Sequence, residues 1–134
     1  MPDAALHALS RHFDAMPPVR AMGVEVLDFD GEMLRLRAPL AANVNDKACA
    51  FGGSLCGLMT LAGWGLATLR LGQAGHQPDV FVADSEVRYL APLYGDLVAE
   101  ARLAQGQSWD AVCAAFAERG RARVMLDACV RLPG

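Results

Sequence analysis

The sequence predicts an α+β fold in which one long, central apolar helix is wrapped by a curved antiparallel sheet. Three observations lead to this prediction: no charged residue between Phe51 and Leu69, a turn dipeptide at Asp30-Gly31, and alternating apolar and polar residues in the last third of the chain. A helix that is apolar all round needs burial, and a sheet provides it. With 134 residues and 54% hydrophobic content, residues 1–134 suit a single domain.

The first part of the chain predicts a helix and a hairpin. Over residues 3–16, apolar side chains recur at spacings of three and four, so an amphipathic helix is expected there, ended by Pro17-Pro18. Residues 22–26 and 34–37 alternate on either side of Asp30-Gly31, a dipeptide typical of tight hairpin turns. This hairpin is expected to have one solvent-exposed face.

The rest of the chain predicts the long helix and then strands. An irregular segment leads to a helix expected from Ser54 to about Leu71, with Gly72 as its C-terminal cap. The alanines of residues 109–117 equally suit a helix, but Gly120 follows as a turn and favours a strand. Four strands are therefore expected, over residues 80–90, 97–103, 109–117 and 124–130.

Composition excludes some classes of function. The formal net charge is −3 and the basic residues are scattered, so no nucleic-acid surface is expected. The four cysteines show no Cys-x-x-Cys spacing and follow no secretory leader, which favours free thiols in a reducing cytoplasm.

Residues 51–69 approach the length of a membrane span, which is about 18 to 20 residues. The stretch is solitary, is interrupted by five glycines, and has only Arg70 as a flanking basic residue. These features favour a buried helix of a soluble protein over a membrane span.

Residues 43–54 carry the pattern most suggestive of chemistry. They place amides, the Asp46 carboxylate and the Gly52-Gly53 pair directly before a helix. A helix N-terminus offers unpaired N–H groups, and glycines let a ligand approach them, as in an oxyanion hole. Asn45 would then orient a water molecule and Asp46 would deprotonate it. The alternative is that these are ordinary loop, capping and turn residues.

Three stretches carry a resemblance to a known family: Phe-Gly-Gly-Ser-Leu at 51–55, Leu-Ala-Gly-Trp-Gly at 61–65, and Tyr-Leu-Ala-Pro-Leu-Tyr-Gly-Asp at 89–96. They resemble hotdog-fold acyl-CoA thioesterases, most nearly the thioesterase family that also forms the C-terminal half of YiiD-type proteins. The likeness spans residues 22–132. It implies the hotdog fold, thioester hydrolysis, and a site between two subunits, so that a homodimer or a dimer of dimers is expected.

The resemblance also suggests roles for individual residues. In phenylacetyl-CoA-type thioesterases an Asn, a His-Gly-Gly and a helix carboxylate form the site, and counting places Asn45, Phe51 and Thr60 at the first, second and last of these positions. Gly52 and Gly53 match the glycines. Thr60 cannot replace an ionised carboxylate as base.

The departure at Thr60 leaves the identity of the base open. Asp46 is the nearest replacement for the base, and Asp84 or Glu86 of a partner subunit is a further alternative. Two roles are open for Thr60: its hydroxyl would hold a water molecule, or it would only bond back to its own helix.

The expected catalytic residues are therefore Asn45, Asp46, Gly53 and Thr60. The expected substrate-binding residues are Phe51, Gly52, Ser54, Trp64, Ser85 and Arg88. Apolar residues at helical spacing, such as Trp64, more often pack in the core than contact a ligand. An exposed strand serine is the simpler account of Ser85, and surface solubility explains Arg88 at least as well.

The function expected from sequence is hydrolysis of an acyl-CoA or acyl-carrier-protein thioester by water, with no metal and no redox cofactor. The alternative is a non-catalytic domain that binds or senses acyl thioesters. A hotdog dehydratase is disfavoured because it needs a loop histidine, whereas His7, His12 and His76 lie outside the loop and the helix start.

Overall fold

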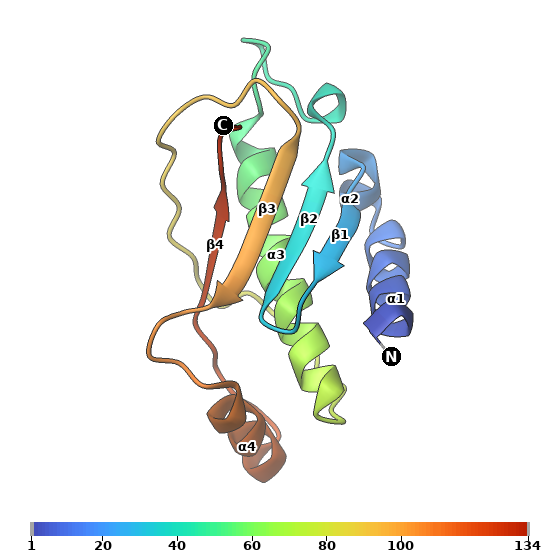
Figure 1. Ribbon diagram of the computed structural model, residues 1–134, viewed down its shortest axis with the longest axis vertical. Coiled ribbons are helices and arrows are strands. Elements are labelled where there is room, and N and C mark those ends of the chain that lie inside the picture. Colours follow the sequence, from blue (N-terminus) through green and yellow to red (C-terminus); the bar gives the residue numbers. More distant parts are fainter. Residues whose placement is uncertain (1, 134) are drawn as a thin grey trace.

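A four-stranded antiparallel sheet wraps a long helix in the computed structural model, which describes residues 2–133 (Figure 1). The sheet order is β1-β2-β3-β4, and α3 lies against one face of it. The architecture predicted from sequence, α+β with a long central helix, is confirmed. The elements in chain order are α1 (Pro2–Asp14), α2 (Pro17–Met22), β1 (Glu25–Phe29), β2 (Met33–Ala38), the 3-10 turn η1 (Leu40–Ala42), α3 (Gly52–Gln73), β3 (Leu97–Leu103), α4 (Trp109–Arg119) and β4 (Leu126–Val130).

The core lies between α3 and the inner face of the sheet. Leu58 and Leu66 of α3 are fully buried, as is Leu34 of β2, whereas Arg35 and Arg37 point to the other face of that strand. Gly65 permits the close approach, because a Cβ atom there would lie only 2.8 Å from Cδ2 of Leu34. By length and composition α3 is apolar enough to cross a bilayer, but its packing makes it the core helix of this fold.

The β1–β2 hairpin forms as predicted, and its turn is held by one carboxylate. Asp30 accepts hydrogen bonds from the N–H groups of Glu32 (2.9 Å) and Met33 (2.8 Å), which lower the pKa of Asp30. Gly31 has φ +99°, a conformation that side chains rarely adopt. The next pairing, β2 with β3, joins distant parts of the chain, with Arg35 opposite Glu100.

Two local predictions were wrong at helix ends. The first helix ends at Asp14, and Pro17-Pro18, which were expected to end it, instead begin α2, because proline suits the first turn of a helix. Gly72 lies inside α3, and the left-handed residue beyond that helix is Gly75, with φ +87°. A cap was expected at Gly72 because nothing in the sequence distinguishes these two glycines.

Residues 109–117 are helical, so the strand predicted there was wrong. Ser108 caps α4, since its Oγ accepts a hydrogen bond from the Ala111 N–H (3.3 Å). Gly120 ends the helix in the left-handed conformation, and its N–H donates to the Phe116 carbonyl (2.7 Å). The expected strands at 97–103 and 124–130 correspond to β3 and β4, the latter starting two residues later.

Residues 79–91 do not form the predicted strand within the single chain. No ladder pairs them with another described residue, and they curve past the outer side of β4 (Figure 1). Their β-branched and apolar residues were interpreted as a strand, but a strand needs a neighbour for its backbone groups. Phe81 and Leu90 on this segment are 84% and 85% exposed.

Candidate active site

The first turn of α3 presents unpaired N–H groups. Phe51 stands at the N-cap position and provides no side-chain cap, so the N–H groups of Gly52, Gly53 and Ser54 make no hydrogen bond to another described residue. The chain on either side is fixed, because the Phe51 N–H donates to the Asn43 carbonyl (2.7 Å) and the Leu55 N–H to the Phe51 carbonyl (3.0 Å). These are preorganised donors with a favourable helix dipole behind them.

Two aromatic rings flank this turn. A Cβ atom at Gly53 would lie 2.6 Å from Cε2 of Phe51, and one at Gly52 would lie 3.6 Å from Cε1 of Tyr89. The Tyr89 hydroxyl donates to the Gly52 carbonyl at 3.0 Å. Phe51 and Tyr89 are both more than half exposed. The two glycines thus let aromatic rings approach the backbone, and a larger residue at position 53 would have to displace the Phe51 ring.

Asn45 organises the loop that precedes α3. Its Oδ1 accepts hydrogen bonds from the N–H groups of Lys47 (2.7 Å) and Cys49 (3.1 Å), and its Nδ2 donates to Cys49 Sγ (3.2 Å). These bonds close a tight loop in which Ala48 has φ +66°. The amide of Asn45 is therefore engaged in holding the loop in the free chain.

Asn43 anchors the same loop to the body of the protein, a role that sequence reasoning missed. It is buried, and its Nδ2 donates to the carbonyls of Met22 and Pro39, both at 2.8 Å. Its backbone carbonyl also receives the Phe51 N–H. Asn43 therefore fixes where α3 begins. The only signal in the sequence was the abundance of amides before the helix.

The two remaining expected catalytic residues lie on either side of the first turn. The Asp46 carboxylate is 79% exposed on the loop and pairs with Lys47 Nζ at 3.0 Å. Thr60 lies about two helical turns beyond Gly53 on nearly the same face of α3. Its hydroxyl makes no hydrogen bond to another described residue, unlike Thr68, which bonds back to the Trp64 carbonyl (2.9 Å).

Of the expected substrate-binding residues, Phe51, Gly52 and Ser54 meet at the first turn, whereas three lie elsewhere. Trp64 is farther along α3, where its Nε1 donates to the Val80 carbonyl (2.9 Å). Its ring packs against His12 of α1, with centroids 5.5 Å apart. Ser85 and Arg88 are exposed on residues 79–91, as are Asp84 and Glu86.

Tyr89 is the residue at this site whose position sequence reasoning did not anticipate. Its pKa is raised, chiefly by partial desolvation and then by the neighbouring Cys56 thiol. The contact between Tyr89 and Gly52 joins positions 37 apart in the chain, so no local sequence pattern predicts it. In the sequence, residues 89–96 were singled out only because they are one of the stretches that resemble the thioesterase family.

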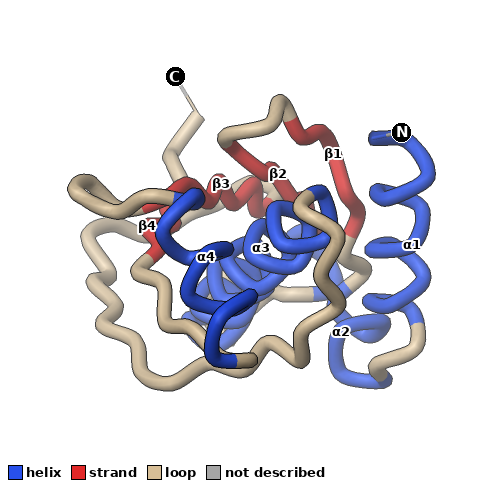
Figure 2. Tube along the Cα trace, turned by 90° about the horizontal axis from the view of Figure 1, so that it is seen from below, coloured by secondary structure: helices blue, strands red, loops and turns tan. Residues whose placement is uncertain are grey.

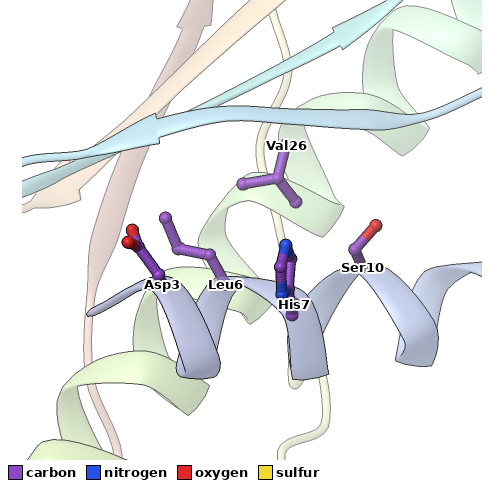
Figure 3. A pocket seen from close by; sticks show the side chains of 5 residues that line it. All are labelled: Asp3, Leu6, His7, Ser10 and Val26. Atoms are coloured by element: carbon purple, nitrogen blue, oxygen red, sulfur yellow. The ribbon is translucent and has the colours of Figure 1, made fainter. Parts of the chain in front are cut away.

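A shallow cavity of about 310 Å³ lies away from this turn, between α1 and β1 (Figure 3). Asp3, His7 and Ser10 line it from one face of α1, facing Val26 of β1. No hydrogen bond joins these three side chains to one another, so they do not form a proton relay. Within residues 2–133, no group of three His, Cys, Asp or Glu side chains is arranged to hold a metal ion.

The fold is of the hotdog type found in thioesterases, and the comparisons with known proteins agree. Residues 6–132 match the family described as "Putative thioesterase (yiiD_Cterm)", to which the chain therefore belongs.

Solved structures show the same fold. A protein of unknown function from Chlorobaculum tepidum is 32% identical, with a TM-score of 0.93 over 99% of this chain and 82% of that one. A protein from Shewanella oneidensis described as a putative thioesterase is 30% identical, with a TM-score of 0.87 over 98% of this chain and 90% of that one. A Pseudomonas aeruginosa protein described as a probable thioesterase is 22% identical and supports the fold alone, with a TM-score of 0.67 over 96% and 91% of the two chains.

Proposed function

We propose that this protein hydrolyses an acyl-CoA or acyl-carrier-protein thioester by direct attack of water. The observation that carries the proposal is the uncapped start of α3, where Gly52, Gly53 and Ser54 offer free N–H groups in a family of thioesterases. Asparagine, serine or aspartate would stabilise a helix at the N-cap position better than phenylalanine does. Leaving these donors free is useful if they bind a developing oxyanion.

The reaction follows from this geometry. Water attacks the thioester carbonyl carbon, the carbonyl electron pair moves onto oxygen, and the N–H groups of the first turn stabilise that charge. Asp46 accepts a proton from water, and the carbon–sulfur bond then breaks to release a carboxylic acid and a thiolate, to which Asp46 gives its proton. Asn45 acts through the loop, because its hydrogen bonds to Lys47 and Cys49 fix the position of Asp46.

The rest of the expected site fits this proposal in part. Thr60 has an uncommitted hydroxyl on the same face of α3 as Gly53, and we assign it to hold a water molecule or the substrate. Phe51 and Ser54 form the wall of the thioester site, and Trp64 shapes the wall of the acyl slot farther along α3. Ser85 and Arg88 lie exposed on residues 79–91, where the Arg88 guanidinium suits the phosphates of coenzyme A.

We propose further that the working form is at least a homodimer, paired through residues 79–91. This segment has no ladder partner in the described chain, exposes Phe81 and Leu90, and lies beside β4, whose outer edge is unpaired in the described sheet. Unpaired backbone that carries apolar side chains favours association with another chain.

The double variant Phe81→Ser and Leu90→Ser should then sediment as a monomer, whereas Leu27→Ser, at a 38% exposed residue on β1, should not change the assembly. A native protein that is monomeric at micromolar concentration and fully active would refute the pairing.

The cytoplasm is the proposed location, and the four unpaired cysteines support it. Free thiols are stable in that reducing compartment.

The decisive experiment measures free thiol released from acyl-CoA substrates from acetyl to palmitoyl, and from an acyl carrier protein carrying the same chains. Gly53→Val should lower turnover by roughly 10²- to 10³-fold, because its side chain crowds the donors and displaces the Phe51 ring. Gly57→Ala is the matched control, since a Cβ atom there meets only Met22, at 3.6 Å. Normal turnover by Gly53→Val would disprove the oxyanion assignment.

The base is tested separately. Asp46→Asn should lower turnover by roughly 10² to 10⁴, with little change in thermal stability, because the carboxylate is exposed. Asn45→Ala should lower turnover less. If Asp46→Asn is silent while Asn45→Ala and Thr60→Val are severe, an amide and a hydroxyl handle the water instead.

A non-catalytic domain that binds or senses acyl thioesters is the second candidate. The observations that favour it are the ion pair between Asp46 and Lys47 and the absence of a carboxylate at position 60. No thiol release from any substrate, together with thermal stabilisation by a non-hydrolysable analogue, would establish this function in place of hydrolysis.

A further inference from the structure

Three arginines lie together at the end of α4 and in the segment that follows it. Arg119 closes the helix, and Arg121 and Arg123 belong to the stretch that leads into β4. All three residues are exposed, and none forms an ion pair with a described residue, whereas Arg35 and Arg131 each pair with a carboxylate. A basic residue such as Arg119 suits the last turn of a helix. Arg121 and Arg123 have no such local role, and they form a cationic surface open to an anionic ligand.

This cationic surface lies at the end of α3 opposite to its first turn (Figure 1). Two contacts fix α4 there: the Arg70 guanidinium stands 5.3 Å from the centre of the Trp109 ring, and the rings of His76 and Phe116 are 5.1 Å apart. Because α3 has 22 residues, it measures about 33 Å. The arm that joins the thioester sulfur of acyl-CoA to its phosphates is shorter than that. A thioester bound at the first turn of α3 is therefore out of reach of the cationic surface of its own subunit.

Residues 79–91 connect these two ends of the molecule. The segment begins beside α4, shortly after His76, and it ends beside the start of α3, where the Tyr89 hydroxyl donates to the Gly52 carbonyl (3.0 Å). When one edge of a sheet pairs with its own copy about a twofold axis, the two strands run antiparallel. Pairing through this segment thus places α4 of one subunit beside the first turn of α3 in the other.

We propose that Arg121 and Arg123 of each subunit bind the phosphates of a coenzyme A thioester whose acyl group lies at the first turn of α3 in the other subunit. This inference rests on the proposed function and on its dimer. Guanidinium groups pair with phosphate through two parallel hydrogen bonds. Arg88 lies at the α3 end of residues 79–91 and adds a guanidinium group from the subunit that holds the thioester. Coenzyme A carries several phosphates and a carrier-bound pantetheine only one, so this cluster favours coenzyme A as the substrate class.

Binding of coenzyme A and of pantetheine, which lacks the phosphates, tests the ligand. The double variant Arg121→Ala and Arg123→Ala should weaken coenzyme A binding by roughly 10- to 100-fold and leave pantetheine binding unchanged. On acyl-CoA it should raise KM and spare kcat, because the phosphates take no part in the bond changes. The matched control is Arg11→Ala with Arg20→Ala, which removes the same charge from exposed positions on α1 and α2, beside β1 (Figure 1). Equal weakening by the control would trace the effect to net charge and overturn the proposal.

Mixed dimers test whether the arginines act across the interface. Gly53→Val chains and Arg121→Ala, Arg123→Ala chains, carrying different tags, are unfolded together, refolded and purified through both tags. If the arginines serve the partner, one site of each mixed dimer carries all the changes and the other carries none. Hydrolysis of limiting acyl-CoA should then return to a level that neither parent reaches. If the arginines serve their own subunit, every site keeps a defect, and the absence of any recovery overturns the proposal.

The outcomes separate this inference from the proposed function. Equal turnover of acyl-CoA and acyl-pantetheine by the native protein overturns the phosphate contact and leaves the thioesterase intact. Loss confined to acyl-carrier-protein turnover in the arginine variant overturns coenzyme A as the ligand. In a protein that hydrolyses nothing, coenzyme A affinity that is lost both in the arginine variant and in the monomeric Phe81→Ser, Leu90→Ser variant supports the proposal and favours the binding domain. Undiminished affinity in that monomer overturns it.

Discussion

The two halves of α3 contain similar small and apolar residues but face different surroundings. From Leu58 to Leu71 the helix is packed against the sheet, with Leu58 and Leu66 fully buried, and Figure 2 shows the sheet on one side of α3. The first turn instead begins after an exposed Phe51 at the N-cap position, which provides no side-chain cap. Glycine allows a close contact in each half: Gly65 brings the helix against Leu34, whereas Gly53 makes room for the exposed Phe51 ring, whose Cε2 lies 2.6 Å from the position a Cβ atom would take. The same helix therefore provides the buried core at one end and an uncapped first turn at the other.

The largest expected difference between the halves comes from truncating side chains. Leu66→Ala should lower the free energy of unfolding by about 2 to 5 kcal/mol, because it leaves a cavity in a fully buried layer. Phe51→Ala, at a 54% exposed residue, should cost about 1 kcal/mol or less. Urea unfolding of both variants measures the contrast. Similar losses would mean that the first turn is packed in solution as tightly as the core.

Adding a methyl group to a glycine gives the next largest effect, and its sign should depend on position. Gly65→Ala should cost about 1 to 3 kcal/mol of unfolding free energy, because the new Cβ atom would stand 2.8 Å from Leu34 and 3.2 Å from Leu9. Gly72→Ala places its new Cβ atom with no other atom within 4 Å and lies in the last turn of α3, so it should gain up to about 0.5 kcal/mol. Denaturant midpoints decide between these signs. A stabilising Gly65→Ala would show that Leu34 and Leu9 can retreat.

A smaller and opposed pair of effects is expected at the N-cap of α3. Phe51→Asn should raise stability by about 0.5 to 1 kcal/mol, since the amide oxygen can accept from the N–H groups of Gly53 or Ser54. By occupying those donors it should also lower turnover, so that stability and activity change in opposite directions. Ser108, which already caps α4, shows the arrangement that α3 lacks. A variant that gains stability and keeps full turnover would remove these donors from the mechanism.

The smallest effect concerns pH and the carboxylate that ties β3 to the loop. Asp96 accepts from the Leu40 N–H (2.9 Å) and from Arg37 (2.6 Å), and these contacts lower the pKa of Asp96. A lowered folded-state pKa contributes stability above the unfolded value of about 4, and this is lost as pH falls through the folded value. Asp96→Asn should therefore lower the thermal midpoint at pH 7, and the difference should vanish in acid. A difference that persists at pH 2 would trace the loss to shape instead of charge.

The sequence predicted the elements whose signal is local and uninterrupted. The absence of charge from Phe51 to Leu69 predicted α3, and the turn chemistry of Asp30-Gly31 predicted the hairpin. The alternation in residues 97–103 predicted β3. In each case the pattern and the packing of the folded chain agree.

The failures arose where one pattern suits two structures or where the partner is distant. The Ser108 and Gly120 pair was available as a start and stop signal for α4, but the alanines between them were interpreted as a strand. Residues 80–90 have strand-like residues but no neighbour in the single chain. At the site, the loop and the glycine pair could be found from sequence, whereas the contact of Tyr89 with Gly52 depends on how the chain returns.

The pairing of β2 with β3, with Arg35 opposite Glu100, sets the order in which the molecule can assemble. The β1–β2 hairpin closes over a two-residue turn and α3 propagates locally, so both can form early. The central seam of the sheet must wait until the chain has passed through all of α3 and residues 79–91, and closing so long a loop has an entropic cost before any contact offsets it. Refolding should therefore be limited by this seam, with the hairpin and the helix present before the sheet closes around them.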